Sequence, residues 1–313
     1  LEKKQQTMLF INRRGYAGFV SCRDCGEAIK CPHCDVTLKL HRNRKLVCHY
    51  CGHTENMPTF CPKCGSKYLG GFGIGTQQIE TAVKKMFPHA RVLRMDADTT
   101  SKKGGHDEIL SAFANREADI LVGTQMIVKG HDFPGVTLVG VIAADMSLYS
   151  SDYCANERTF QLLEQVSGRS GRGKKQGTVM IQTYNPDHFV LQCVKNHDYQ
   201  SFYQKEMEMR KLAKYPPYCY LISILVQGKK EDDVTFCSQQ IKEYLVKQLP
   251  KAIVLGPANC TIYKMNDIYR KRMTLKITNT THVYEVLHAM SDYYNKKGRK
   301  VNVICDFNPY TTI

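Results

Sequence analysis

The stretch that decides the fold is Cys22-Arg-Asp-Cys25-Gly-Glu-Ala-Ile-Lys-Cys31-Pro-His-Cys34, followed by Cys48-His-Tyr-Cys51 and Cys61-Pro-Lys-Cys64. These segments contain eight of the fourteen cysteines, arranged as four Cys-x-x-Cys pairs. Each pair places two thiolates on one tight turn, and two such turns complete a tetrahedral zinc site. The spacing therefore predicts two zinc ions bound by eight cysteines.

A disulfide framework is the alternative for this many cysteines. Such frameworks are typical of short secreted chains, whereas this chain has 313 residues, shows no secretory signal segment and scatters its other six cysteines singly. Glycine also follows three of the four pairs directly, at Gly26, Gly52 and Gly65, where a metal-binding turn needs a positive φ angle. We therefore interpret the cysteines as zinc ligands.

The segment between the second and third pairs, residues 35–47, indicates which pairs share an ion. Apolar and polar residues alternate along it, and the polar residues 41–44 form a turn before a second short strand. A hairpin of this length brings the second and third pairs together and leaves the first and fourth to share the other ion. The expected ligand sets are Cys22, Cys25, Cys61 and Cys64 for one zinc, and Cys31, Cys34, Cys48 and Cys51 for the other.

The net charge of +15 is distributed unevenly, with +7 in residues 1–70, +2 in residues 71–215 and +6 in residues 216–313. Basic ends around a near-neutral centre favour contact with a polyanion at the ends, although a solvated basic surface gives the same count. No apolar run approaches the length that crosses a membrane. We therefore expect no membrane association and, without a targeting segment, a cytoplasmic location.

Strands and helices alternate through the first two thirds of the chain, outside the cysteine segment. This alternation predicts a parallel α/β sheet with helices on both faces, interrupted by the cysteine segment after its first strand. The expected strands are 7–12, 90–95, 119–122, 137–143 and 177–183, and the expected helices are 77–87, 106–115, 155–167 and a long stretch at 187–214.

The last third has a different order, which begins after Tyr215-Pro216-Pro217. Strands at 218–227, 253–263, 270–278 and 301–307 and helices at 232–249 and 282–297 give the order βαββαβ of a ferredoxin-like α+β domain. We therefore expect three domains, formed by residues 1–20 with 69–215, by residues 21–68 and by residues 216–313.

Two motifs in the α/β part carry chemistry. Residues 120–134 form a strand followed by a glycine-punctuated loop, at the strand end where open α/β sheets bind ligands. Residues 165–173 place Arg169 and Arg172 after a helix, and guanidinium groups suit phosphate oxygens. The segment Gly168–Lys174 matches seven positions of a P-loop, but Lys175 stands where Ser or Thr should bind Mg²⁺, and a helix precedes it instead of a strand. It is not a P-loop, and no other P-loop or acidic magnesium-binding box is found.

Together, Arg13-Arg14-Gly15-Tyr16-Ala17, the four cysteine pairs, Lys129-Gly-His-Asp-Phe-Pro134 and Gln165-x-x-Gly168-Arg169-x-Gly171-Arg172 resemble the carboxyl-terminal half of the PriA family. This family comprises superfamily 2 DNA helicases with 3′-to-5′ polarity that restart abandoned replication forks. The resemblance implies an α/β RecA-like second motor lobe with an inserted two-zinc ribbon module, followed by the ferredoxin-like domain. It also implies ATP and Mg²⁺ in the full-length enzyme and a nucleoid-associated protein. The implied partners are forked and single-stranded DNA, single-stranded-DNA-binding protein and primosome or helicase-loading proteins.

The resemblance assigns roles to the motif residues. Arg169, Arg172 and Gln165 correspond to the last helicase motif, whose arginines face the ATP γ-phosphate. Gly130 and Asp132 belong to the motif that couples the nucleotide to the DNA track, and they are the expected nucleotide-binding residues of that motif. The expected DNA contacts are Arg13, Arg14, Tyr16, Thr124, Gln125 and Lys129.

Further DNA contacts are expected from the basic and aromatic run Tyr269-Arg270-Lys271-Arg272, since such runs suit strand stacking and phosphate contact. An exposed strand edge is the structural alternative for Arg270 and Arg272. Because the P-loop lobe is absent, we expect this chain to be a fragment that hydrolyses no ATP alone. The alternative function is a zinc-ribbon adaptor for DNA or protein without motor activity.

Overall fold

The computed structural model describes residues 1–11, 19–34, 36–41, 44–71, 75–96, 99–100, 104–124, 133–150, 152–168, 177–296 and 300–309. The chain divides into two compact units. The first unit comprises Leu1–Glu27, Phe60–Ser150 and Cys154–Phe202, and the second comprises Ala28–Thr59, Ser151–Tyr153 and Tyr203–Ile313. The chain thus passes from one unit to the other after residues 27, 59, 150, 153 and 202.

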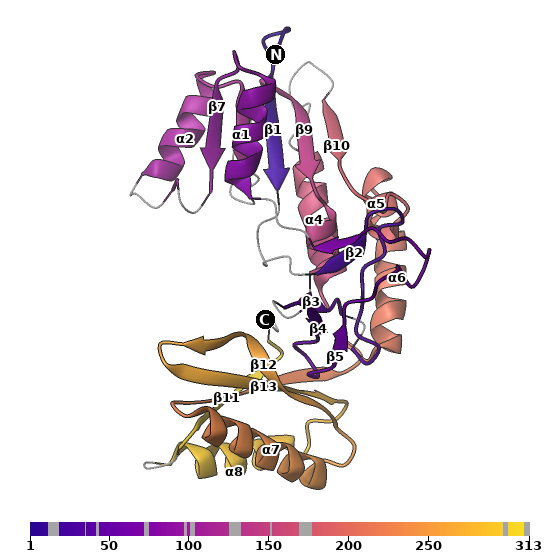
Figure 1. The fold of residues 1–313 in the computed structure, drawn as a ribbon, viewed down its shortest axis with the longest axis vertical. Coiled ribbons are helices and arrows are strands. Elements are labelled where there is room, and N and C mark those ends of the chain that lie inside the picture. The colour runs from indigo at the N-terminus through magenta and orange to yellow at the C-terminus, as the bar shows by residue number, and fades with distance from the viewer. Residues whose placement is uncertain are drawn as a thin grey trace. The chain divides into compact units, whose positions relative to one another are not determined.

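A five-stranded parallel sheet forms the centre of the first unit (Figure 1). Its order is β10-β9-β1-β8-β7, so the first strand of the chain lies in the middle. This order requires crossover connections, and described helices lie in those between β1 and β7, between β7 and β8 and between β9 and β10. The strands are β1 (Gln6–Ile11), β7 (Val92–Met95), β8 (Ile120–Gly123), β9 (Val136–Ile142) and β10 (Thr178–Ile181).

Alternate residues of β8 face opposite sides of this sheet, as the two-residue period of a strand requires. Ile120 and Val122 pack in one cluster with Ile79 and Val83 of helix α1 (Thr76–Met86). Phe113 of helix α2 (Gly105–Ala114) is fully buried, and its carbonyl accepts a hydrogen bond from the side chain of Gln6 in β1 at 2.7 Å. The predicted parallel α/β fold is therefore confirmed.

The helices after β9 differ from the prediction in two places, at a short helix before residue 150 that was not predicted and within the stretch 187–214. They are α3 (Asp145–Leu148), α4 (Ala155–Ser167), α5 (Phe189–Lys195) and α6 (Tyr199–Leu212). The helical stretch predicted at 187–214 is divided into two helices, because Asn196 ends α5 and His197 adopts a positive φ of 54°. Asp198 then accepts a hydrogen bond from the Ser201 amide at 2.9 Å and starts a new helix.

The cysteine segment contains two small sheets. Strands β2 (Val20–Cys22) and β6 (Leu69–Gly71) pair antiparallel. Strands β3 (Lys39–Leu40) and β4 (Lys45–Val47) form the predicted hairpin, and β5 (Thr54–Asn56) adds a third strand beside β4. The strand pair lies in the first unit, whereas the three-stranded sheet lies in the second.

The larger part of the second unit is the ferredoxin-like domain. Its four antiparallel strands have the order β12-β13-β11-β14, and Figure 1 shows helices α7 and α8 together on one face of this sheet. One core cluster joins both helices to alternate residues of the strands. The elements are β11 (Tyr220–Gly228), α7 (Glu231–Gln248), β12 (Ile253–Met265), β13 (Ile268–Ile277), α8 (Val283–Asn295) and β14 (Asn302–Phe307).

Strands β12 and β13 are longer than predicted because the turn between them is short. Asn266 and Asp267 both adopt positive φ angles, of 50° and 59°, which is the conformation of a two-residue hairpin turn. The Asn-Asp pair is a known signal for this turn, and it extends both strands to the turn itself.

The three domains expected from the sequence remain a prediction, since the contacts group the residues into two units. Among the described residues, no helix is both long and apolar enough to span a membrane.

Candidate metal centres and motor motifs

The four cysteine turns share one backbone geometry. In each, the amide of the first cysteine donates to the carbonyl five residues further on, at 2.7–2.8 Å. The donor and acceptor residues are Cys22 and Glu27, Cys31 and Val36, Cys48 and His53, and Cys61 and Ser66. The glycines after three of the turns have φ angles of 71°, 83° and 74°, so the expected positive φ at Gly26, Gly52 and Gly65 is confirmed.

The sulfur atoms gather into two groups of four. Cys22, Cys25, Cys61 and Cys64 form the first cysteine site, and Cys31, Cys34, Cys48 and Cys51 form the second cysteine site. Within each site all four sulfurs lie within 4.8 Å of one another. The structure therefore brings the cysteines together in the two sets that the sequence predicts.

The sulfur distances fit a tetrahedral zinc ion. Cys22 and Cys64 have Sγ atoms 3.6 Å apart, Cys25 and Cys61 3.7 Å, and Cys31 and Cys51 3.6 Å. Four sulfurs at a Zn–S distance of about 2.3 Å are separated by about 3.8 Å. Both sites can therefore hold zinc with little rearrangement.

The electrostatics of the second cysteine site also favour binding of a cation. Hydrogen bonds with Cys31 and Cys48 raise the pKa of Cys34, while hydrogen bonds from Cys34 and Cys48 lower the pKa of Cys31. The pKa of one cysteine is thus lowered while the pKa of its neighbour is raised, because a second negative charge in the cluster would be repelled by the first. A divalent cation removes this repulsion and lets all four thiols ionise.

The first cysteine site is held by residues of its own unit. Arg23, inside the first turn, donates to the carbonyl of Gly71 at 2.8 Å, and its guanidinium carbon lies 5.0 Å from the centre of the Tyr184 ring. The Cα of Gly26 faces Tyr184 and Asn185 so closely that a Cβ there would lie 2.6–2.7 Å from their atoms. The first turn is therefore packed against the segment that follows β10.

The second cysteine site is held by the carboxyl-terminal part of its unit. Tyr215, which is 4% exposed, donates its hydroxyl to the carbonyl of Cys34 at 2.9 Å. The His49 ring donates from Nδ1 to the carbonyl of Asn259 in β12, also at 2.9 Å. Gly52 adjoins Pro257 and Ala258, at the distances of ordinary contact. The hairpin and the ferredoxin-like domain therefore pack as one body.

The predicted motor residues are only partly described. Thr124 follows β8, and its amide lies 3.4 Å from the carbonyl of Met95 at the end of β7, so it stands at the carboxyl edge of the sheet. Gln165 is exposed on the last turns of α4. The predicted residues that lie outside the described part of the chain are Arg13, Arg14, Tyr16, Gln125, Lys129, Gly130, Asp132, Arg169 and Arg172.

A buried carboxylate at the same edge was missed by the sequence analysis. Asp96, 1% exposed and directly after β7, accepts hydrogen bonds from the Thr76 hydroxyl at 2.5 Å and from the Thr99 amide at 3.1 Å. Thr76 begins α1, so this carboxylate fixes the start of that helix beside Thr124. An aspartate immediately after a predicted parallel strand is the signal that could have identified it.

Arg270 and Arg272 lie half-buried on β13, on the sheet face opposite the helices. Met273 and Leu275 lie on the same strand and point into the core beneath the helices. Because successive side chains of a strand point to opposite faces, the two arginines point away from this core. Lys39 and Arg272 are both close enough to His49 to lower its pKa, although burial is the larger cause. The strand and the hairpin thus contribute cations to one region of the second unit.

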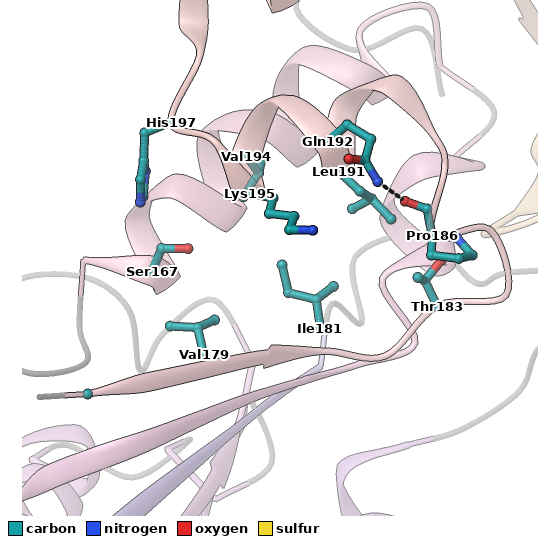
Figure 2. Close-up of a pocket in the computed structure, with 11 residues that line it drawn as sticks. Ser167, Val179, Ile181, Thr183, Pro186, Leu191, Gln192, Val194, Lys195 and His197 are labelled. Atoms are coloured by element: carbon teal, nitrogen blue, oxygen red, sulfur yellow. Dashed lines mark hydrogen bonds between the residues drawn. The ribbon is translucent and has the colours of Figure 1, made fainter.

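One groove lies beside the end of α4 in the first unit (Figure 2). It has a volume of about 540 Å³, and Val179 and Ile181 of β10 face Leu191 and Lys195 of α5 across it. Its lining mixes apolar side chains with the polar ones of Ser167, Thr183, Gln192, Lys195 and His197. We assign it no role.

Three protein families match separate parts of the chain. The helicase conserved C-terminal domain matches residues 72–174, the PriA DNA helicase Cys-rich region domain matches residues 31–55, and the primosomal protein N C-terminal domain matches residues 211–310. The Cys-rich region contains the whole second cysteine site, which supports zinc as its metal.

Curated relatives match nearly the whole chain. The replication restart protein PriA of Bacillus subtilis is 45% identical over 99% of this chain and 39% of its own length. That of Synechocystis is 47% identical over 88% and 34%, and that of Haemophilus influenzae is 37% identical over 99% and 43%. The chain thus spans about two fifths of the length of these relatives.

Two solved structures are weaker matches. The Hef helicase domain of Pyrococcus furiosus is 15% identical with a TM-score of 0.25 and covers 57% of this chain and 21% of that one. Dbp5 of Saccharomyces cerevisiae bound to RNA and ADP BeF3 is 14% identical with a TM-score of 0.27, over 44% and 35%. TM-scores this low do not establish a shared overall fold.

The fold, the paired cysteine sites and the matched domains define a helicase carboxyl-terminal lobe of RecA-like type with an inserted cysteine ribbon and an added ferredoxin-like domain. The helicase match favours the motor interpretation over the zinc-ribbon adaptor. More particularly, the chain belongs to the PriA family of replication restart proteins.

Proposed function

We propose that this chain forms the second motor lobe, zinc module and carboxyl-terminal domain of an ATP-dependent DNA helicase that moves 3′ to 5′ and restarts stalled replication forks. The observation that carries this proposal is the match of residues 72–174 to a helicase carboxyl-terminal domain, inside a chain that aligns with replication restart proteins over nearly its whole length. The work takes place on forked and single-stranded DNA in the cytoplasm, together with single-stranded-DNA-binding protein and helicase-loading proteins.

The ATP site in this proposal is shared with a P-loop lobe. Arg169 and Arg172 approach the γ-phosphate, where guanidinium groups stabilise the charge that develops during transfer. Gln165 orders the same motif from the last turns of α4, and Gly130 and Asp132 contribute next to the nucleotide and its Mg²⁺. Closure of the two lobes on ATP then moves the DNA strand by one step.

The DNA track runs in this proposal along the carboxyl edge of the parallel sheet, where Thr124 adjoins the end of β7. Open α/β sheets bind ligands at this edge because loops and helix starts converge there. Asp96 fixes the start of α1 beside it, which supports a preformed surface. The other proposed contacts on this track are Gln125, Lys129, Arg13, Arg14 and Tyr16.

ATP turnover tests the shared site. We expect no hydrolysis by the 313-residue chain alone, and we expect Arg172→Ala in the full-length protein to lose DNA-stimulated turnover by about 10³-fold while nucleotide binding persists. Lys175→Ala, a charge removal three residues away, is the matched control and should retain turnover. Near-normal hydrolysis by Arg172→Ala would remove the arginine from the ATP site.

Salt-dependent DNA binding tests the DNA contacts that we also propose for Arg270 and Arg272 on β13. Removing one phosphate-binding side chain should reduce the slope of log affinity against log salt by about 1. Arg270→Glu with Arg272→Glu should therefore weaken binding and flatten that slope. Lys271→Glu on the intervening residue is the matched control for Arg272→Glu alone, since both change the charge by the same amount, and equal effects of these two single variants would contradict specific contacts by the arginines.

A further inference from the structure

A buried lysine lies on the face of the ferredoxin-like sheet opposite helices α7 and α8. Lys276 of β13 is 6% exposed, and it alternates with Leu275 and Ile277, which belong to the core beneath the helices. Its side chain therefore points away from that core. An ammonium group buried this deeply needs compensation, because burying an unpaired charge is far more costly than burying an apolar group.

Two uncharged partners hold this ammonium group in place. The Nζ of Lys276 donates to the carbonyl of Ala213 at 2.8 Å and lies 3.5 Å from the centre of the Tyr215 ring. The ring contact is favourable, since a cation is attracted to the negative face of an aromatic ring. Neither partner carries a full negative charge. Within the part of the chain that the structure describes, Lys276 forms no ion pair with a carboxylate.

Cys219 lies close enough to act on Lys276 but does not supply the negative charge. Its Sγ donates to the carbonyl of Lys214 at 3.1 Å, so the sulfur carries a proton. Burial raises the pKa of Cys219, which keeps that proton in place despite the neighbouring ammonium group. The other sulfur that acts on Lys276 belongs to Cys34 of the second cysteine site: burial lowers the pKa of Lys276, and this cysteine opposes the change.

Tyr215 joins Lys276 to the second cysteine site. The face of its ring contacts the ammonium group, and its hydroxyl donates to the carbonyl of Cys34 at 2.9 Å. Only the width of one ring and one hydrogen bond therefore separates Nζ from the backbone of a cysteine in that site. A cation over the ring also polarises the hydroxyl, which strengthens its hydrogen bond. Lys276, Tyr215 and the four cysteines all belong to the second unit.

We propose that Lys276 is the buried counter-charge of the second cysteine site and determines how tightly that site retains zinc. A zinc ion bound by four thiolates carries two excess negative charges. A buried cation beside the cluster offsets part of that charge where salt screens it little. It thereby favours the ionised thiols that zinc binding requires. Lys276 acts on the site through Tyr215 and through space, and it is not itself a ligand.

Zinc retention in the intact 313-residue chain tests this proposal, with the first cysteine site as an internal reference. The zinc-loaded chain is equilibrated with graded concentrations of EDTA and alkylated briefly, and mass spectrometry gives the fraction of each site that has lost its metal. We expect Lys276→Met to lower the zinc affinity of the second site by about 10- to 100-fold, as loss of an outer contact to a metal site does. The first site lies in the other unit and should keep its affinity.

Three further variants separate the charge from the other properties of the side chain. Lys276→Gln keeps an N–H donor for the carbonyl of Ala213 but not the charge, and it should weaken the second site as Lys276→Met does. Lys276→Arg keeps the charge and should restore most of the affinity. Lys264→Met removes an exposed charge from β12 of the same sheet and should leave both sites unchanged.

Four results would overturn the proposal. They are an unchanged second site in Lys276→Met, normal affinity in Lys276→Gln, equal losses in Lys276→Arg and Lys276→Met, and an equal change at both cysteine sites. Normal affinity in Lys276→Gln would mean that the hydrogen bond to Ala213 matters and the charge does not. Should Lys276→Met fail to fold with zinc bound, Lys276→Gln is judged by the same outcomes.

Discussion

The two cysteine sites are built from the same turn but face different surroundings. At the first cysteine site Cys64 is exposed and Cys25 half-buried, whereas at the second Cys31, Cys34 and Cys48 are all buried. The first packs against the segment after β10 through Arg23 and Gly26. The second packs against the ferredoxin-like domain through Tyr215 and His49. One continuous cysteine segment therefore stabilises two separate units of the chain.

The division into two units explains why the ligand sets are nested instead of consecutive. A nested arrangement leaves residues 28–59 as a closed loop with its own site, so that loop can belong to a different unit from its two ends. Each ion then stabilises local backbone that has too little apolar surface to fold unaided. Substitutions at one site should therefore affect mainly the unit to which that site belongs.

Loss of the second cysteine site should have the largest effect. We expect Cys34→Ser with Cys48→Ser to reduce bound zinc from two ions to one and to lower the free energy of unfolding of the second unit by at least several kcal/mol, because metal binding and folding are coupled there. Elemental analysis and urea unfolding measure the two quantities. The control is Cys237→Ser on α7, which should keep both ions.

Loss of the first cysteine site should also remove one zinc ion but should spare the second unit. The matched double variant is Cys61→Ser with Cys64→Ser. Because the first cysteine site is partly exposed, we expect a smaller decrease in the free energy of unfolding, of about 2–5 kcal/mol. Urea unfolding followed by a probe in the ferredoxin-like domain checks it. An equal loss in that domain for both double variants would contradict the division into two units.

Two glycines of the first cysteine site differ in how closely other atoms surround them. Gly26 and Gly65 have nearly the same φ, 71° and 74°, but a Cβ at Gly26 would collide with Tyr184 and Asn185, while none of the described atoms lies within 4 Å of one at Gly65. We expect Gly65→Ala to cost about 1 kcal/mol for backbone strain and Gly26→Ala about 3 kcal/mol for strain and collision. Thermal unfolding measures the difference, and equal costs would show that Gly26 is not packed as described.

The smallest effect is expected for the contact of Tyr215 with the second cysteine site. Tyr215→Phe keeps the ring but leaves the buried carbonyl of Cys34 without its donor, at a cost of about 1–2 kcal/mol. Tyr218→Phe removes the hydroxyl of a side chain that is 41% exposed and should cost about zero. If the two variants have the same midpoint in urea, the hydrogen bond does not stabilise the second unit.

The sequence predicted most of the fold because its signals were local. The Cys-x-x-Cys spacing and the alternation in residues 35–47 predicted both ligand sets, and the order of strands and helices predicted both sheets. The break at His197 was missed because an uninterrupted helical pattern hides a single residue with positive φ. The Asn266-Asp267 turn was missed although its residues signal it.

The contacts that join distant parts of the chain could not be predicted. Tyr153 and Tyr215 are far apart in the sequence, and nothing in either local pattern indicates that their rings stack. Likewise, the packing of Tyr215 on Cys34 depends on how the hairpin meets the ferredoxin-like domain. Such contacts follow from tertiary packing, which periodicity and spacing do not encode.

Hydrogen exchange over the whole chain, compared between Cys61→Ser and Cys34→Ser, tests most directly whether each cysteine site stabilises its own unit. The predicted result is faster exchange in residues 19–27, 60–71 and the segment after β10 for the first variant. The second should instead speed exchange in residues 28–59 and in β12 and β13. The same exchange pattern in both variants would contradict the account, since it would mean that the eight cysteines stabilise one body.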